Sequence, residues 1–345
     1  MSDEDTELGL DVPTILQPLR VPMPSSNSSC IDAISRRSAL QSIAAFGALS
    51  ATGLLPNTAK AKSDSGSKIK FSLNTSTIRG HKLKITESIT KAAAAGYDQI
   101  EPWMRELEEY ISSGGKLSDL KQQLQDNNLQ VVSAIGFPSW VVDDNQQRTK
   151  GIEQLKHDME ILAQLDAPYI AAPPMGVHQG NAPPLDLNAA AERYHHILEL
   201  GKEFGVTPQV EIWGPAKNMS KIAEAAYIAI AANHPNAGIL PDVYHLYRGG
   251  SDFHGLELLA GCGINLFHFN DYPKTDDRTK LNDGDRVYPG HGVAPWSLIC
   301  DILKQMNFQG TASLELFNKQ YWAQPADQVM ADGLKSMKTV LAPLL

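Results

Sequence analysis

Cysteine is scarce in this chain, with three residues among 345. None of Cys30, Cys262 and Cys300 belongs to a Cys-x-x-Cys pair or lies beside a histidine at metal-site spacing. This number is too small for a disulfide framework, which excludes the small disulfide-stapled folds. We expect Cys262 and Cys300 to be small apolar packing residues.

Basic charge is also in short supply. The chain has 30 Lys and Arg against 39 Asp and Glu, so its formal net charge is −9. A protein of this sign repels phosphate backbones, because nucleic-acid binding depends on clustered basic residues. We therefore expect no nucleic-acid partner.

Long hydrophobic runs are absent as well. The apolar stretch near the N-terminus, Ile43 to Leu55, is shorter than the ~20 residues that span a bilayer, so no stable membrane insertion is expected. It follows the pair Arg36-Arg37 and precedes Ala59-Lys60-Ala61, which is the layout of a twin-arginine export signal. We expect residues 1–61 to form an N-terminal extension with this signal, and the protein to be periplasmic. Translation could begin at Met1 or at Met23.

The remaining residues, 62–345, alternate short β-like runs with longer helical ones, eight times over. Strands that alternate with helices predict a parallel sheet covered by helices. No Gly-rich phosphate motif follows an early strand, which argues against a dinucleotide fold. Eight units in a chain of this size indicate an α/β fold of the closed (β/α)₈ TIM-barrel type. The expected strands are Ile69–Asn74, Gln99–Trp103, Gln130–Ile135, Tyr169–Ala172, Thr207–Ile212, Gly238–Asp242, Asn265–Phe269 and Ala312–Phe317.

Metal-competent side chains occur near the ends of the last four expected strands. They are Glu211, Asp242, His268 and Glu315, each flanked by large apolar residues. A closed barrel brings the carboxyl ends of its strands around one point, where three carboxylates are unstable together unless a cation neutralises them. Three carboxylates and one imidazole suit one divalent ion, first Mn²⁺ or Mg²⁺, with Co²⁺ or Zn²⁺ as alternatives.

With these residues, the sequence resembles the xylose isomerase-like barrel superfamily, in particular its sugar phosphate isomerase/epimerase branch. The resemblance implies that Glu211, Asp242, His268 and Glu315 bind one metal. It also implies that Glu211 and Glu315 are the catalytic acid/base pair, which moves a proton between adjacent carbons through an enediolate. The family's Asp-x-x-His pattern recurs as Asp242 to His245, which implies that His245 contacts the substrate.

The same superfamily contains apurinic endonucleases, which use three zinc ions and more histidines. Asp285-Arg286-Val287 resembles their Asp-Arg-His element, but Val287 stands where the last ligand should be. We therefore expect no nuclease activity, and we expect Arg286 to contact the substrate.

Three further residues are candidates for substrate binding. Glu101, near the end of the second expected strand, could bind substrate hydroxyls. Trp103 and Trp213 follow strand ends, where aromatic faces can stack on a sugar. The partner we expect is therefore a small-molecule carbohydrate, and the chain could assemble into a homo-oligomer.

Three functions remain open at this point. The first is a metal-dependent isomerase or epimerase of a sugar or polyol derivative, which removes a proton beside a carbonyl with metal assistance. The second is a lyase or dehydratase acting on a keto-sugar or an oxidised glycoside through the same enediolate. The third is a non-catalytic exported sugar-binding barrel, against which the presence of both Glu211 and Glu315 argues.

Overall fold

The structure is a computed structural model that describes residues 69–260 and 263–345. The expected export signal, Cys30 and Cys262 lie outside these residues. Cys300 is a buried free thiol, as predicted.

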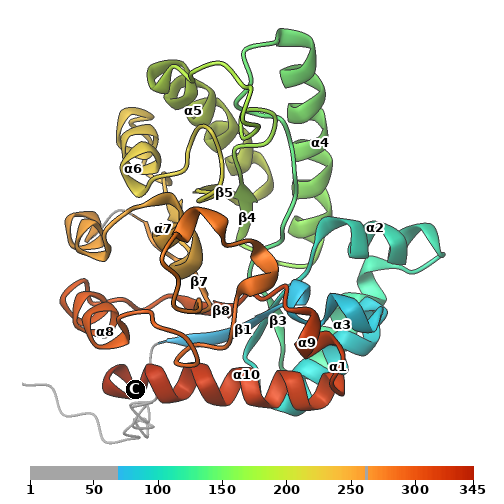
Figure 1. Ribbon diagram of the computed structural model, residues 1–345. Helices are drawn as coiled ribbons and strands as arrows, with labels where there is room; N and C mark the ends of the chain where they lie inside the picture. Colours follow the sequence, from blue (N-terminus) through green and yellow to red (C-terminus); the bar gives the residue numbers. More distant parts are fainter. Residues whose placement is uncertain (1–68, 261–262) are drawn as a thin grey trace, which may run out of the picture. The chain divides into compact units, whose positions relative to one another are not determined.

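Eight parallel strands form the centre of the described domain (Figure 1). Five are hydrogen-bonded in the order β3-β2-β1-β8-β7 and three in the order β4-β5-β6. Each of the eight expected segments contains one of these strands. Their bounds are β1 Lys70–Asn74, β2 Gln99–Glu101, β3 Gln130–Val131, β4 Tyr169–Ala172, β5 Thr207–Glu211, β6 Ile239–Leu240, β7 Leu266–Phe269 and β8 Thr311–Leu314.

Two short contacts join the two sheets into a ring. Between β6 and β7, Asp242 and His268 form a parallel bridge, and the His268 amide donates to the Pro241 carbonyl at 3.0 Å. Between β3 and β4, the Ala171 amide donates to the Ala134 carbonyl at 3.0 Å. The fold is therefore a closed (β/α)₈ TIM barrel, as predicted.

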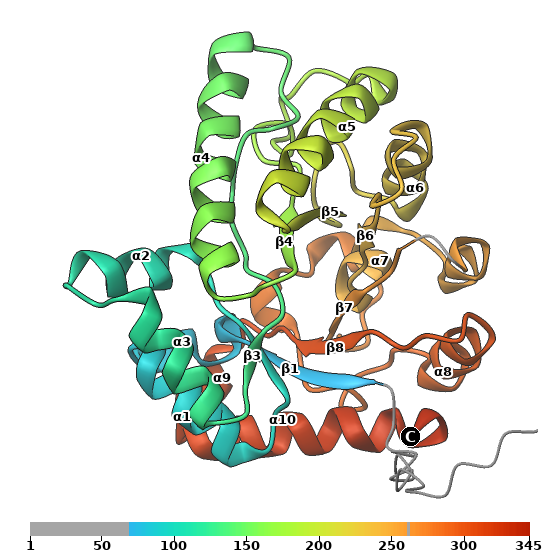
Figure 2. The same cartoon turned by 180° about the vertical axis from the view of Figure 1, so that it is seen from behind.

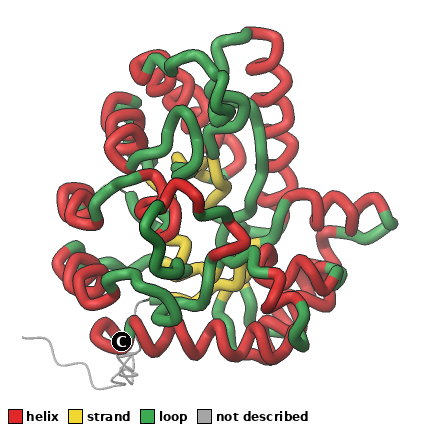
Figure 3. The backbone as a smooth tube through the Cα atoms, in the orientation of Figure 1, coloured by secondary structure: helices red, strands yellow, loops and turns green. Residues whose placement is uncertain are grey.

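Helices surround the strands on the outside, as the red and yellow segments of Figure 3 show. Among the described residues, no helix combines the length and apolar character that a membrane crossing requires. The α-helices are α1 Ile85–Ala95, α2 Met104–Ser112, α3 Leu117–Asp126, α4 Asn145–Gln164, α5 Leu187–Phe204, α6 Ile222–Ala231, α7 Val243–Gly249, α8 Trp296–Gln305, α9 Lys319–Trp322 and α10 Ala326–Val340. The 3₁₀ turns are η1 Thr75–His81, η2 Phe253–Leu259, η3 Arg278–Lys280, η4 Asp283–Asp285 and η5 Ala342–Leu344.

Local sequence signals account for where several helices begin and end. Gly96 and Gly205 end α1 and α5 with φ of 91° and 69°, a left-handed conformation that glycine adopts without a steric cost. The carboxylates of Asp144 and Asp186 cap the first turns of α4 and α5. Left-handed glycines thus mark where these helices end, and capping aspartates mark where they begin.

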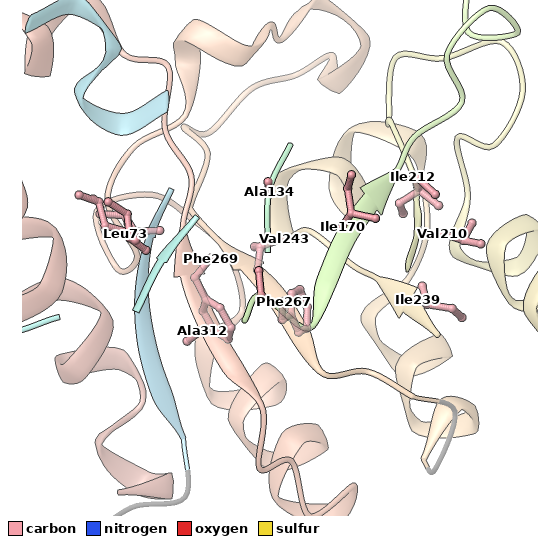
Figure 4. Packing of buried hydrophobic residues seen from close by; sticks show 14 of the residues in the cluster. Leu73, Ala134, Ile170, Val210, Ile212, Ile239, Val243, Phe267, Phe269 and Ala312 are labelled. Atoms are coloured by element: carbon pink, nitrogen blue, oxygen red, sulfur yellow. The ribbon is translucent and has the colours of Figure 1, made fainter. Parts of the chain in front are cut away.

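Side chains alternate between the two faces of each strand. The outward set, which includes Leu73, Ile170, Val210 and Phe267, packs under the helices in one large apolar core (Figure 4). Full burial of each such side chain contributes about 1.5–3 kcal/mol. The side chains on the other face of each strand fill the barrel interior, which holds a small apolar group and polar residues. The small apolar group is Val132, Ile135, Ala171, Leu240 and Leu266.

Five strands, β2, β3, β5, β6 and β8, end earlier than expected, whereas β1, β4 and β7 end where predicted. Asp242 is not the end of a strand but the N-cap of α7, and its carboxylate accepts a hydrogen bond from the His245 amide at 2.7 Å. Glu315 and Trp103 likewise lie beyond β8 and β2. Backbone pairing still continues in places beyond these ends, since the Glu315 amide donates to the Phe269 carbonyl at 3.2 Å.

Candidate active site

The four predicted metal ligands meet inside the carboxyl end of the barrel. All four are buried, and His268 and Asp242 have no exposed surface. The His268 Nδ1 lies 3.3 Å from Glu315 Oε2, 3.8 Å from Asp242 Oδ2 and 3.9 Å from Glu211 Oε1. Strands distant in the sequence thus place three carboxylates around one imidazole nitrogen.

This arrangement has the geometry and chemistry of a divalent-metal site. One ligand atom from each of Asp242, His268 and Glu315 lies within 4.8 Å of the others. Within the described residues, His268 Nδ1 and Glu211 Oε2 are buried without a hydrogen-bond partner. Buried polar atoms are rarely left without a partner, and a cation bound here would supply one to both. Oxygen-rich sets with one imidazole fit ions such as Mn²⁺, Mg²⁺ or Zn²⁺.

A buried glutamate beneath the site fixes the histidine. Glu101 Oε2 lies 3.0 Å from His268 Nε2 and accepts hydrogen bonds from Asn74 Nδ2 at 2.9 Å and Ser313 Oγ at 2.8 Å. A proton on Nε2 shared with this carboxylate leaves the lone pair of Nδ1 directed at the other carboxylates. We expected Glu101 to contact the substrate, but it is fully buried and lies outside the cavity described below.

A second buried residue holds Asp242 in place. The Asn270 side-chain amide donates to Asp242 Oδ2 at 2.8 Å, and its carbonyl accepts from the Tyr244 amide at 2.8 Å. Asp242 Oδ1 is occupied by the cap of α7. The start of α7 and the end of β7 therefore orient the same carboxylate.

Arg286 lies directly against the predicted ligands. Its Nη1 is 2.7 Å from Glu315 Oε2 and 3.1 Å from Asp242 Oδ2, and its Nη2 is 2.6 Å from Asp283 Oδ1. Burial lowers the pKa of this guanidinium, but the three carboxylates raise the pKa above its usual value. Its charge thus offsets part of the acidic charge at the site.

His245 completes the polar floor of the cavity. Its Nδ1 accepts from the Gly214 amide at 3.0 Å, and its Nε2 lies 3.0 Å from Arg286 Nη2. Burial, and then the positive charge of Arg286, lower the pKa of His245 and keep the ring neutral. A neutral imidazole accepts a hydrogen bond at one nitrogen only, so the Gly214 amide and the Arg286 guanidinium compete to donate to this ring.

The two predicted catalytic glutamates have pKa values displaced in opposite directions. Burial raises the pKa of Glu211 to about 8, against a smaller opposite effect of His268. Burial also raises the pKa of Glu315, but His268 and Arg286 outweigh it and hold that pKa below the usual range. A pair of carboxyl groups with separated pKa values is the arrangement that acid/base catalysis requires.

A cavity of about 290 Å³ opens over these groups. Its floor is lined by Glu211 and Glu315, predicted to be catalytic, and by His245 and Arg286, predicted to contact the substrate. The predicted Trp103 and Trp213 line its wall. Sequence reasoning missed the six other lining residues, which are Arg79, Ile135, Phe137, Pro215, Asp283 and Phe317.

The missed residues lie in loops and turns, where no periodicity marks a side chain as inward. Phe137 packs between the two tryptophans, with ring centroids 5.0 Å from Trp103 and 6.1 Å from Trp213. Asp283 and Arg286 come from the long segment after β7, whose richness in Asp, Lys, Arg and Gly was the available signal. Arg79 had no comparable signal.

A family model described as the xylose isomerase-like TIM barrel matches residues 89–340. The chain belongs to this family.

Curated proteins that resemble this chain in sequence include three kinds of enzyme. An inosose isomerase of Halalkalibacterium halodurans is 28% identical over 239 residues, which are 68% of this chain and 83% of that protein. A D-psicose 3-epimerase of Agrobacterium fabrum is 23% identical, over 67% of this chain and 78% of that protein. A 3-dehydroshikimate dehydratase of Pseudomonas putida is 22% identical over 73% of this chain, but the match covers only 39% of that enzyme.

Solved structures bear out the fold. The structure of the IolI protein with a bound zinc atom superposes with a TM-score of 0.74 at 23% identity. The match covers 80% of this chain and 99% of the IolI chain.

Proposed function

We propose that this protein is a divalent-metal-dependent isomerase or epimerase of a sugar or polyol derivative. One observation carries the proposal. The carboxylates of Glu211, Asp242 and Glu315 converge on His268 Nδ1, which has no hydrogen-bond partner among the described residues, and the site lies below a cavity with aromatic walls. The inosose isomerase and the D-psicose 3-epimerase support the reaction class.

Glu211, Asp242, His268 and Glu315 would hold the metal. When bound, a divalent ion polarises a carbonyl and stabilises the negative charge that develops as a neighbouring carbon loses its proton. The IolI structure contains zinc, and the oxygen-rich ligand set also suits Mn²⁺ and Mg²⁺. We therefore propose Mn²⁺ or Mg²⁺ first, with Co²⁺ and Zn²⁺ as alternatives.

The two glutamates carry the proton. One ionised carboxylate removes a proton from the carbon beside the carbonyl, and the other carboxyl group returns a proton to the adjacent carbon or to the opposite face of the same carbon. Transfer to the adjacent carbon isomerises the substrate, and return to the opposite face epimerises it. The opposite displacement of their pKa values supports assigning an acid and a base to this pair.

The remaining cavity residues bind and orient the substrate. Arg286 and His245 offer polar groups at the floor, where substrate oxygens would lie. Trp103 and Trp213 offer aromatic faces that can stack on the C–H surface of a sugar or polyol ring. Burial of the floor excludes bulk water, which strengthens the electrostatic interactions there.

Dehydration is the second candidate reaction. Loss of the same proton followed by departure of a β-hydroxyl would make the protein a dehydratase, and the 3-dehydroshikimate dehydratase of Pseudomonas putida favours this alternative.

A substrate panel distinguishes these outcomes. The metal-loaded protein is incubated with ketoses, inososes and cyclic keto acids, and the products are read by carbon-resolved NMR. An isomerase relocates the carbonyl, an epimerase inverts one carbon, and a dehydratase forms a double bond. Binding without any product across the panel would reject the proposal in favour of a sugar-binding barrel. Activity that survives complete removal of metal would reject the metal requirement.

We also propose that the protein reaches the periplasm by the twin-arginine route. The support is the sequence alone, namely Arg36-Arg37, the short apolar stretch and Ala59-Lys60-Ala61.

A further inference from the structure

Arg79 is a second cationic side chain on the wall of the cavity, and the turn that carries it is firmly held. In η1, Thr77 Oγ1 donates to the Leu314 carbonyl at 2.9 Å and accepts from the Leu316 amide at 3.1 Å. The indole nitrogen of Trp322 donates to the Ser76 and Thr77 carbonyls at 3.3 and 3.2 Å. These bonds tie η1 to β8 and α9, so that the position of Arg79 is built into the barrel rim.

The guanidinium of Arg79 is stacked between aromatic rings but has no anionic partner. Its Cζ lies 3.8 Å from the centroid of Trp103 and 5.0 Å from that of Phe317. Its Nε and Nη2 are buried and find no acceptor among the residues that the structure describes. Buried donors without acceptors cost about 1–3 kcal/mol each, so a ligand that supplied acceptors would be favoured.

The nearby carboxylates each bond to other residues through at least one oxygen. Glu106, which is close in the sequence to Trp103, accepts from Thr75 Oγ1 at 2.6 Å and from the Trp103 amide at 3.0 Å. Asp283 and Glu315 are paired with Arg286. Arg286 therefore has three carboxylate partners, whereas Arg79, on the same cavity, has none within ion-pair distance among the described residues.

We propose that Arg79 is a substrate-binding residue that recognises an anionic group, a carboxylate or a phosphate ester, carried by the substrate away from its reacting carbons. The inference rests on the proposed function, because it places the rest of that substrate over Glu211 and Glu315. It narrows the substrate to an acidic sugar or polyol derivative.

The chemistry of arginine fits this role. A guanidinium stacked on an indole keeps its N–H groups in one plane, where they can bind an oxyanion in a bidentate manner. The carboxylates at the floor repel the same anionic group, so Arg79 would orient the substrate with its acidic end at the wall. The neutral end would then lie at the predicted metal site.

Three ring compounds test the inference by isothermal titration calorimetry on the metal-loaded full chain. They are myo-inositol, which is neutral, quinate, which carries a carboxylate, and myo-inositol 1-phosphate. We expect at least one anionic probe to bind about tenfold or more tightly than myo-inositol, the value that follows from one charged hydrogen-bonded pair. Which anion is preferred distinguishes a carboxylate from a phosphate ligand.

Arg79→Met should abolish this preference by weakening binding of the preferred anion about tenfold and changing the affinity for myo-inositol much less. The matched control is Arg105→Met, because Arg105 stacks on the same Trp103 ring, at 4.8 Å, but is exposed and does not line the cavity. The control should keep the preference. An anion preference that survives in Arg79→Met, or wild-type protein that binds no anionic probe more tightly than the neutral one, would overturn the proposal.

Salt provides a measurement that does not depend on the variant folding. The wild-type affinity for the preferred anion should fall as NaCl rises, while that for myo-inositol should stay constant. A salt-independent anion affinity would contradict a role for Arg79.

Exchange of solvent deuterium into neutral ketoses separates this inference from the proposed function. If Arg79→Met and wild type exchange deuterium equally and neither prefers anions, the anion site is refuted and the proton-transfer function stands. If the anion preference depends on Arg79 but no compound exchanges, the anion site stands and the proton-transfer function fails.

Discussion

His268 depends on one buried hydrogen bond for its orientation. The 3.0 Å contact between its Nε2 and Glu101 sets the tautomer that directs Nδ1 at the three carboxylates. Glu101 is held in turn by Asn74 and Ser313, so the first, second and eighth strands together position a ligand on the seventh. Glu101 would thus determine whether the histidine can bind a metal without being a ligand itself.

Glu101→Gln tests this dependence. The amide can donate to His268 Nε2, which favours the tautomer with the proton on Nδ1 and weakens the ligand. We expect metal affinity to fall about 10- to 100-fold with little change in fold. Metal titration monitored by calorimetry measures the loss, with Glu203→Gln, on the exposed face of α5, as control. Unchanged affinity would show that Glu101 does not set the tautomer.

Asp158 is a buried carboxyl group outside the site. It lies in α4 with no exposed surface, neither of its oxygens has a partner among the described residues, and burial raises its pKa to about 7, with Glu108 adding to the effect. The folded state therefore binds the proton more tightly than the unfolded chain does. The stability that this protonated group contributes is complete below the unfolded pKa near 3.8 and is lost as the pH rises through about 7.

Asp158→Asn should remove this pH dependence. Relative to wild type, we expect a gain in unfolding free energy on the order of 4 kcal/mol at pH 8, and less than half of that at pH 5. Urea denaturation at the two pH values measures both differences. An equal gain at pH 5 and pH 8 would mean that Asp158 does not titrate between them.

At the scale of elements, the N-cap of α7 combines a structural and a chemical task. Asp242 caps the helix with Oδ1 and faces His268 and Arg286 with Oδ2. The sequence predicted Asp242 as a ligand but placed it at the end of a strand. The N-cap was missed because the expected strand was extended through Pro241, which separates β6 from α7.

Asp242→Asn and Asp242→Ala separate the two tasks. Asparagine can cap the helix with its one oxygen, but its NH₂ group then faces the Asn270 and Arg286 donors, so we expect Asp242→Asn to keep the cap, to lose metal affinity and to lose some thermal stability. Asp242→Ala should lose the cap as well, with about 1 kcal/mol of additional destabilisation. Thermal melts and metal titration of the two variants provide the comparison. Equal stability of both variants would show that the cap contributes nothing.

How much of this architecture could be read from the sequence differs by element. The strands and most helices follow from hydrophobic periodicity, and Glu211, Asp242, His268 and Glu315 follow from their position near strand ends. Arg79 and Phe137 could not be predicted, because their place in the cavity depends on how turns pack on distant strands. Glu101 was recognised as polar and near a strand end, but only packing shows that it lies beneath the histidine.

At the scale of the whole molecule, barrel closure is what creates the site. Each carboxylate alone is an ordinary polar residue, and only the ring of parallel strands brings three of them around one imidazole. A metal that binds only this folded arrangement couples its loading to folding.

That coupling bears on the proposed export route, because twin-arginine transport carries folded proteins. We expect Arg36→Lys combined with Arg37→Lys to leave folded, metal-loaded protein inside the cell, with the wild type cleaved near Lys62 and found in the periplasm. Cell fractionation with N-terminal sequencing measures this. Uncleaved wild-type protein in the cytosolic fraction would contradict export and leave the barrel account intact.

The central claim is that Glu211 and Glu315 move a proton on a metal-bound carbohydrate, and solvent deuterium uptake tests it most directly. Metal-loaded wild type in D₂O should incorporate deuterium beside the carbonyl of at least one ketose, inosose or cyclic keto acid, observed by NMR. Glu211→Gln and Glu315→Gln should each lower the rate about 10²- to 10⁴-fold, with Glu203→Gln unchanged. Normal exchange in Glu211→Gln, or no exchange by wild type with any member of the panel, would contradict the account.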